Sequence, residues 1–538
     1  MYRVLGFVFL TTCLTAPSVG LRADPIWTLD ALRGAGVLPP KPTVFAHPMK
    51  DASVDYTVGD KRDLWTYDLS VMPPKNVSIA STCQGVGDTV VVFVADSEWD
   101  TKVIQADVDA IIHAFDVDTP NQSGAGIMAT NTALFGAMSD VDGDPHLLVF
   151  IYAIPGYQGQ AFDGFFRPED LAPFKPGCES NPMDYCSNEA EIVHVNSHNA
   201  GSDYMIGVMA HEFQHLIHHA FDVNEESWIN ESMSELAMSA NGYEDAGHLG
   251  AYLASHTKPL VTSEFVHYGA VMLFGTFLYE RFGDGFIQAL VKASQNGIQG
   301  LEAAWQANGI DVGFNDAFAD WALANATSDY DLLDWPDVKP DGTLPALQGG
   351  QATGDFTVQP YTYHWLAGPV AGAGAQQDLV VRFKAPSKAT LRVAGFSGDE
   401  LVLATPAVDG GWRVAANLDE VIVALGNPTG NAVTSAIDFA LDSQDTPVPE
   451  EIAPDAGVPD VPATDATTAD STPPDTGSGE VAAPDATTAD STPPDTGSGE
   501  VAAPDDGSGC AMSIRPTTGS PALLLLALTF LVMRRRFG

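Results

Sequence analysis

The chain has 538 residues, a formal net charge of -46 and a sequence pI of about 4.2. A protein this acidic offers no basic face to a phosphate backbone, so nucleic acid is excluded as a partner. The length allows about three domains. No lysine or arginine occurs between Asp445 and Cys510, so part of the acidity belongs to a segment that is unlike a folded domain.

The first 20 residues have the pattern of a secretory signal. Arg3 supplies the positive charge, residues 4–14 form an apolar stretch, and residues 18–20 are a small-residue cleavage site. We therefore expect residues 1–20 to be removed on export. Residues 21–75 contain several prolines and few recurring apolar stretches, which predicts an irregular N-terminal arm or pro-segment.

Residues 76–335 change from a strand-like to a helical pattern. Apolar runs at 89–94, 147–152 and 191–195 predict strands, the last at the edge of the active-site cleft. Helices are expected over 102–115, from near Asp203 as the N-cap residue, and over 225–241 (closed by Gly242), 266–282, 286–294, 300–308 and 315–326. This order predicts an α+β domain with a mixed sheet in its first half and helices in its second.

Three aspartates precede the second predicted strand. Asp140, Asp142 and Asp144 form a D-x-D-G-D stretch that is similar to the start of a calcium-binding loop. Such a loop needs a bidentate glutamate at its twelfth position, where this chain has Ile151. We therefore expect a tight Asp/Gly turn, with a Ca²⁺ site as the alternative.

The five cysteines indicate an exported protein with little use of disulfides. Cys13 leaves with the signal and Cys510 belongs to the C-terminal segment. Cys178 and Cys186 bracket a short loop containing proline and asparagine, and we expect them to pair, stabilising the fold by about 2–3 kcal/mol. Cys83 is then left as a free, buried thiol.

The stretch His211-Glu212-Phe213-Gln214-His215 is the strongest chemical signal in the chain. Positions i and i+4 share one face of a helix, so both imidazoles can reach a single ion. Zinc accepts imidazole nitrogen, and catalytic zinc takes three protein ligands and a water. Glu212 lies beside the first histidine, where it can act as base towards that water. The motif predicts a zinc metallopeptidase.

A third ligand is expected from the next helix, where Trp228-Ile229-Asn230-Glu231 is followed by Glu235. We assign Glu231 to the metal. Glu235 lies one turn further on the same face and is expected to hydrogen-bond a ligand histidine and fix its tautomer. His218, His219, His194 and His198 are expected to be structural or surface residues.

These motifs resemble the gluzincins, thermolysin-like metallopeptidases that use HExxH and a downstream Asn-Glu, and within them the hyicolysin family of secreted bacterial peptidases. The resemblance covers about residues 88–326 and is carried by five stretches: VFVADSEW (92–99), MSDVDGD (138–144), HEFQHLI (211–217), WINE (228–231) and YGA (268–270). It implies a thermolysin-like fold, His211, His215 and Glu231 as zinc ligands, and Glu212 as base. The spacing differs from thermolysin, because only fifteen residues lie between His215 and Glu231.

The shorter spacing leaves Glu225, Glu226 and Glu235 open as alternative ligands. The donor that would stabilise the oxyanion is not fixed by the motif either. His267 and Tyr268 begin the next long predicted helix and are the candidates, with Tyr268 preferred and simple core packing as its alternative.

The C-terminal part falls into three segments. Short alternating runs over 345–445 predict a β-sandwich, and residues 446–509 contain DATTADSTPPDTGSGEVAAP twice in succession, which predicts a disordered acidic linker. Residues 510–538 begin with the cysteine of a Gly509-Cys510 pair and contain a short apolar run and Arg534-Arg535-Arg536. They resemble a myxobacterial-type C-terminal sorting signal, which implies membrane anchoring and display on the cell surface.

The sequence therefore predicts an exported, surface-anchored zinc endopeptidase that acts on extracellular proteins or peptides. A zinc aminopeptidase is one alternative, although its usual Gly-x-Met-Glu-Asn stretch is missing. A non-catalytic adhesin built on a peptidase fold is the other, and the presence of Glu212 argues against it.

Overall fold

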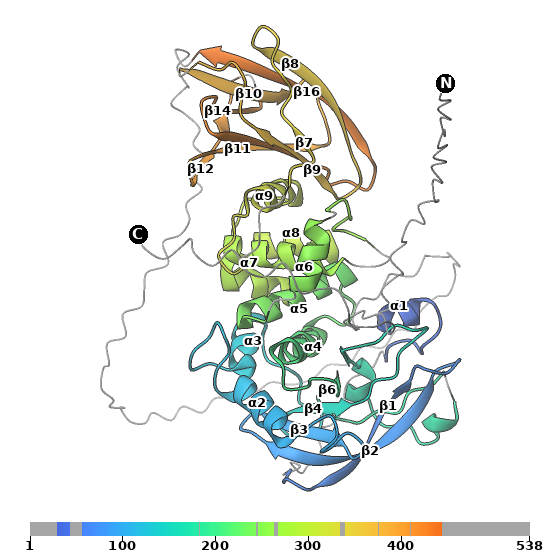
Figure 1. Ribbon diagram of the computed structural model, residues 1–538. Helices are drawn as coiled ribbons and strands as arrows, with labels where there is room; N and C mark the ends of the chain where they lie inside the picture. Colours follow the sequence, from blue (N-terminus) through green and yellow to red (C-terminus); the bar gives the residue numbers. More distant parts are fainter. Residues whose placement is uncertain are drawn as a thin grey trace, which may run out of the picture.

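The computed structural model describes residues 29–42 and 56–443, apart from residues 182, 244–245, 255, 263–266, 334–338, 375 and 409. The predicted signal (1–20), linker (446–509) and C-terminal anchor (510–538) lie outside the described residues. Within them the chain is α+β, as the sequence predicts. Figure 1 shows a curved sheet at the bottom, helices in the middle and two further sheets at the top.

The N-terminal sheet has six strands in the order β1-β2-β3-β4-β6-β5. Its strands are β1 (Lys61–Asp68), β2 (Lys75–Val86), β3 (Val90–Ala95), β4 (Leu147–Tyr152), β5 (Gly164–Phe166) and β6 (Ile192–Asn196). The pairs β3–β4 and β4–β6 are parallel, and the other three pairs are antiparallel. This makes the sheet mixed, with β5 as an antiparallel edge strand.

The central strands are unbroken apolar runs because both faces of the sheet are covered. In β3, Val92 and Val94 pack into the core formed with the helices, whereas Val91 and Phe93 pack into a second core on the opposite face. The helices on the first face are α2 (Gln105–Asp116), α3 (Ile127–Phe135) and α4 (Asp203–Phe221). Leucines of α1 (Leu29–Gly34) belong to the second core.

The second half of this unit is helical (Figure 1). Its helices are α5 (Ser227–Asn241), α6 (Ala246–Leu253), α7 (Tyr268–Val291), α8 (Gly297–Ala307) and α9 (Phe314–Thr327). The two helices predicted at 266–282 and 286–294 are the two parts of α7, which is interrupted where Gly283 takes the non-helical angles φ 74 and ψ -179. Gly242, with φ 84, ends α5 in the left-handed conformation that favours glycine.

Two five-stranded sheets form the C-terminal sandwich, in the orders β13-β14-β10-β16-β8 and β12-β11-β15-β9-β7. Their strands are β7 (Gly342–Thr343), β8 (Gln351–Val358), β9 (Tyr363–Gly368), β10 (Gln377–Phe383), β11 (Thr390–Ser397), β12 (Glu400–Leu403), β13 (Thr405–Pro406), β14 (Trp412–Ala415), β15 (Glu420–Gly426) and β16 (Val433–Ser443). Side chains of both sheets, among them Val381 and Val423, share one core.

Several local predictions differ from the structure. Residues 61–68 form β1, so this part of the predicted irregular arm belongs to the sheet. The strand predicted at 191–195 is β6, and β5 pairs with its outer side, so β5 is the edge strand of the sheet. The strand β5 and the helices α3 and α6 have no counterpart among the predicted elements. The N-cap of α4 is Ser202, whose hydroxyl accepts a hydrogen bond from the Met205 backbone N–H, and Asp203 is the first helical residue.

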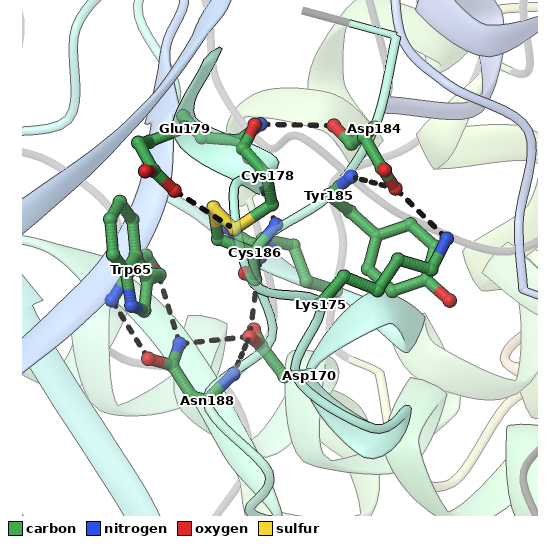
Figure 2. The surroundings of a disulfide bond; sticks show 11 residues. Trp65, Asp170, Lys175, Cys178, Glu179, Asp184, Tyr185, Cys186 and Asn188 are labelled. Carbon is green, nitrogen blue, oxygen red and sulfur yellow. Dashed lines mark hydrogen bonds and ion pairs between the residues drawn. A yellow bond between two sulfur atoms is a disulfide. The ribbon is translucent and has the colours of Figure 1, made fainter. Parts of the chain in front are cut away.

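The loop between β5 and β6 is closed by the expected disulfide between Cys178 and Cys186, and Cys83 is free and buried. Figure 2 shows how Asn188 anchors this loop to β1. Its amide exchanges hydrogen bonds with the Trp65 backbone and donates to Asp170. The loop contains the 3₁₀ turns η1 (Pro168–Leu171) and η2 (Cys178–Ser180). The disulfide therefore stabilises the loop that connects the edge strand β5 to its neighbour β6.

Among the described residues, no helix is both long enough and apolar enough to span a membrane.

Candidate metal centre

The helix α4 positions two of the three predicted ligands. Its apolar residues, including Met205, Met209 and Phe213, lie in the main core, which holds the helix against the sheet. His211 and His215 are one turn apart and both are fully buried. Helix α5 packs against α4 and brings Glu231, which is 3% exposed, to the same place. The three residues form one compact cluster.

The donor atoms of this cluster have the spacing of a metal site. His211 Nε2 lies 3.1 Å from His215 Nε2, and Glu231 Oε2 lies 3.3 Å from the first nitrogen and 3.5 Å from the second. Three ligands bound to zinc at about 2.0–2.1 Å with tetrahedral angles stand about 3.3 Å apart. The three atoms therefore have the spacing of one face of a zinc tetrahedron.

The outer nitrogens of the two imidazoles face polar groups that favour a proton on Nδ1. His215 Nδ1 lies 3.0 Å from Asn230 Oδ1 and 3.0 Å from the Ser234 hydroxyl. His211 Nδ1 lies 3.4 Å from a carboxylate oxygen of Glu235. With its proton on Nδ1, each ring has a lone pair free at Nε2, which is the form that binds a metal.

The charges of this cluster are strongly perturbed. Burial opposes a positive charge on His211, but contacts with Glu231 and Glu235 outweigh it and raise the pKa of His211 to about 10. Burial also opposes the charge of Glu231, but the two histidines outweigh it and lower the pKa of Glu231 to about 2. Two buried carboxylates on α5 thus favour positive charge at the imidazole side of α4.

Glu212 lies beside the cluster and is fully buried. Its Oε2 accepts a hydrogen bond of 2.9 Å from the Phe166 backbone N–H of the edge strand β5. Its Oε1 has no hydrogen-bond partner among the described residues. Burial raises the pKa of Glu212 well above its ordinary value. One oxygen is thus held by the sheet, and the other is available to a proton.

Tyr268 and His267 stand at the start of α7. The Tyr268 ring is buried, with its centroid 6.4 Å from that of His211, and it stacks on His248 of α6 at 4.9 Å. His267 is the N-cap residue and its ring contacts Tyr252 at 5.2 Å. Of the two candidates, Tyr268 is therefore the one whose ring contacts a predicted metal ligand, His211. Its role as oxyanion donor stays a prediction.

The alternative ligands lie elsewhere. Glu225 accepts hydrogen bonds from the Gly297 and Glu226 backbone N–H groups, and Glu226 accepts one from the Trp228 indole. Both are absent from the cluster formed by His211, His215 and Glu231. Glu235 faces the outer nitrogen of His211, as expected of a positioning residue.

The other histidines that were predicted to be structural or surface residues are not part of the cluster. His218 and His219 are buried near the end of α4, His194 lies 2.8 Å from Asp170, and His198 lies 3.0 Å from Asp163.

The aspartate-rich turn is present as expected. Asp140 accepts a hydrogen bond from the Gly143 N–H, Asp142 accepts one from the Asp144 N–H, and Gly143 has the left-handed φ of 80. Ligand oxygens of Asp140, Asp142 and Glu191 lie within 4.8 Å of one another. Asp144 is not in this group, and its Oδ1 accepts a hydrogen bond from the His146 backbone N–H.

The sequence did not predict that Asn230 and Ser234 would contact His215, or that the Phe166 N–H would donate to Glu212. Asn230 directly precedes the predicted ligand, so the Asn-Glu pair carried a signal for it. Ser234 and Phe166 carried none, because their roles arise from the contact of α5 and β5 with α4.

Comparison with known proteins identifies no family. No family model matches the chain, and no curated protein matches it. Among solved structures, a periplasmic inhibitor of g-type lysozyme from Aeromonas hydrophila aligns at 16% identity over 19% of this chain and 98% of that chain, with a TM-score of 0.15. A similarity of that size carries no argument about fold or function.

Proposed function

We propose that this chain is an exported zinc metalloendopeptidase that hydrolyses peptide bonds of extracellular proteins or peptides. The observation that carries the proposal is the triangle of Nε2, Nε2 and Oε2 atoms of His211, His215 and Glu231, with sides of 3.1, 3.3 and 3.5 Å. Its oriented imidazoles and the adjacent Glu212 are a donor set suited to catalytic rather than structural zinc. A thermolysin-like fold is part of the proposal, supported by the sheet half, the helical half and the site on α4 and α5.

Zinc bound there would polarise the scissile carbonyl and acidify water. Glu212 would accept the proton of the attacking water through Oε1 while Phe166 holds Oε2, and would return it to the leaving amine. Tyr268 would donate to the developing oxyanion. Asn230, Ser234 and Glu235 would keep the imidazoles oriented.

Export is supported by the disulfide, since such bonds persist in oxidising compartments. The membrane anchor proposed at 510–538 and the linker before it lie outside the described residues. They would display the peptidase at the cell surface.

The test is zinc content together with casein hydrolysis for the wild type and Glu212→Gln. We expect one zinc per chain in both, and a loss of activity of about 10²–10⁴-fold in Glu212→Gln, because the amide cannot take a proton. Glu400→Gln, an exposed glutamate of β12, serves as the matched control and should behave as the wild type. Full activity in Glu212→Gln would refute the mechanism.

Further substrates distinguish an endopeptidase from the two alternatives, an aminopeptidase and a non-catalytic adhesin. Cleavage of N-acetylated internal peptides is expected of an endopeptidase, whereas cleavage confined to free N-termini would identify an aminopeptidase. A wild-type protein that binds no zinc and cleaves nothing would favour an adhesin.

A further inference from the structure

A second group of acidic side chains lies at the ends of β4 and β6 where these strands begin. Asp140 and Asp142 belong to the turn before β4, and Glu191 immediately precedes β6. The two strands are parallel neighbours, and Leu148 of β4 donates a backbone hydrogen bond to the Glu191 carbonyl. Carboxylates distant in sequence are thus brought together by strand pairing, with ligand oxygens within 4.8 Å of one another.

The hydrogen bonds of the turn leave carboxylate oxygens unused. Glu191 is 1% exposed, and its Oε1 accepts the Val141 N–H, but its Oε2 is buried without a hydrogen-bond partner among the described residues. Asp144 Oδ2 is likewise buried without a partner there. A buried carboxylate oxygen without a partner is costly unless a cation compensates it.

The arginine whose charge acts on this group is committed elsewhere. Burial raises the pKa of Asp142 above its ordinary value, and the positive charge of Arg62 only partly opposes this rise. The Arg62 guanidinium donates to the Tyr56 hydroxyl and to the Asn188 carbonyl. The carboxylates are therefore not neutralised by a hydrogen-bonded ion pair with Arg62.

We propose that Asp140, Asp142 and Glu191 bind a calcium ion, with the buried Asp144 carboxylate beside it. Oxygen-only donor sets select hard cations. Calcium takes six to eight oxygens at about 2.3–2.6 Å, so oxygens on opposite sides of the ion stand up to about 5 Å apart. Asp140 is exposed, so water can complete the shell. The turn itself, rather than an EF-hand loop, supplies the ligands, and Glu191 provides the carboxylate that the turn lacks.

This ion would stabilise the strand pair that holds Glu212. Glu191 lies two residues before Val193, which pairs with Phe166, and the Phe166 N–H donates to Glu212. The calcium site does not depend on the peptidase proposal, since its ligands are separate from the zinc cluster.

The test is calorimetric titration of CaCl₂ into the full-length, zinc-loaded protein in calcium-free buffer, with MgCl₂ titrated separately. We expect one Ca²⁺ per chain, at least tenfold weaker binding of Mg²⁺, and a rise in Tm that saturates with Ca²⁺. Glu191→Gln and Asp140→Asn should each weaken Ca²⁺ binding at least tenfold. Asp109→Asn, an exposed aspartate on α2 that also loses one charge, should bind as the wild type.

Asp140→Asn decides the result if Glu191→Gln fails to fold, because an asparagine Oδ1 can still accept the Gly143 N–H. Absence of Ca²⁺ binding to the wild type, binding unchanged in Asp140→Asn, or equal affinity for Mg²⁺ would overturn the proposal. None of these readouts uses proteolysis, so the result does not depend on whether the chain is a peptidase.

Discussion

At the scale of single residues, two glutamates one turn apart on α5 have different neighbours. Glu231 faces the Nε2 atoms of both histidines, and Glu235 faces the outer nitrogen of His211. A carboxylate in the first position completes the donor set, whereas one in the second position orients a ring. The same chemical change at the two positions should therefore have different consequences.

We expect Glu231→Gln to lower zinc affinity by more than about 100-fold and to abolish activity. Glu235→Gln should lower affinity by about 10–100-fold, the range measured for partners of metal-binding histidines, and activity should recover at high zinc. Competition with a chromophoric zinc chelator measures both affinities. If Glu235→Gln loses the metal and Glu231→Gln keeps it, the two assignments are exchanged.

The sequence was sufficient for residues whose roles follow from helical spacing. His211 and His215 lie four apart on one helix, and Glu231 and Glu235 lie four apart on the next, so each pair could be assigned to a face. Spacing could not choose between Glu231 and Glu225, because that depends on how α5 crosses α4. Ser234 and Glu191 were missed for the same reason, since each acts on a residue of another element.

At the scale of elements, the long periodic helices and the buried strands β3 and β4 were predictable. The strand β5 was not, because Gly164-Phe165-Phe166 is too short to show alternation, and it exists through pairing with β6. Helix α3 contains the buried polar residue Asn131, whose amide donates to the Ala210 carbonyl of α4. Such a polar contact interrupts the apolar period on which helix prediction depends.

The site also requires α5 and α7 to approach closely, and Gly275 allows this. A Cβ at Gly275 would stand 2.3 Å from the Ser232 carbonyl oxygen, one residue after Glu231. Because a backbone atom of a packed helix cannot move easily, Gly275→Ala should destabilise the protein by about 1–3 kcal/mol. It should also weaken zinc binding, since α5 carries Glu231.

Gly250→Ala is the matched control in α6. Nothing lies within 4 Å of a Cβ at this position, so alanine should stabilise the helix by about 0.5–1 kcal/mol. Urea denaturation of both variants measures the free energies of unfolding. Equal stability of the two variants would show that α5 and α7 are not in close contact at Gly275.

At the scale of the whole molecule, the helical half and the sandwich share a core. Trp321 of α9 packs edge-on against Tyr363 of β9 at 5.4 Å, and Arg392 of β11 donates to Asp320 of α9. The sequence predicted both units but could not predict this contact. Trp321 could equally have been buried inside the helical half, and Tyr363 inside the sandwich. The sandwich is therefore expected to contribute to the stability of the unit that carries the candidate metal centre.

Asp341 forms a second contact between the helical half and the sandwich. It precedes β7, and its carboxylate accepts hydrogen bonds from His256, which follows α6, and from the Trp365 backbone N–H of β9. His364 Nδ1 lies 3.1 Å from the same carboxylate. Burial opposes the charge of Asp341, but these donors outweigh it and hold the pKa of Asp341 below its ordinary value of 3.8.

A depressed pKa in the folded state gives stability that is present above the unfolded pKa and is lost as the pH falls through the folded pKa. At pH 6, Asp341→Asn should therefore lower the free energy of unfolding by about 1–2 kcal/mol, a value reduced for partial exposure. The difference from the wild type should shrink below about pH 4, where the Asp341 carboxyl of the unfolded wild-type chain begins to take up a proton. Urea denaturation at pH 6 and pH 3.5 measures it.

Asp355→Asn, an exposed aspartate of β8, is the control and should change stability little at either pH. A difference between Asp341→Asn and the wild type that is the same at both pH values would mean that the contact does not depend on the charge of Asp341. If the expected pattern is found, acid weakens the attachment of the sandwich to the helical half through the Asp341 carboxylate, which joins the segment after α6 to β9.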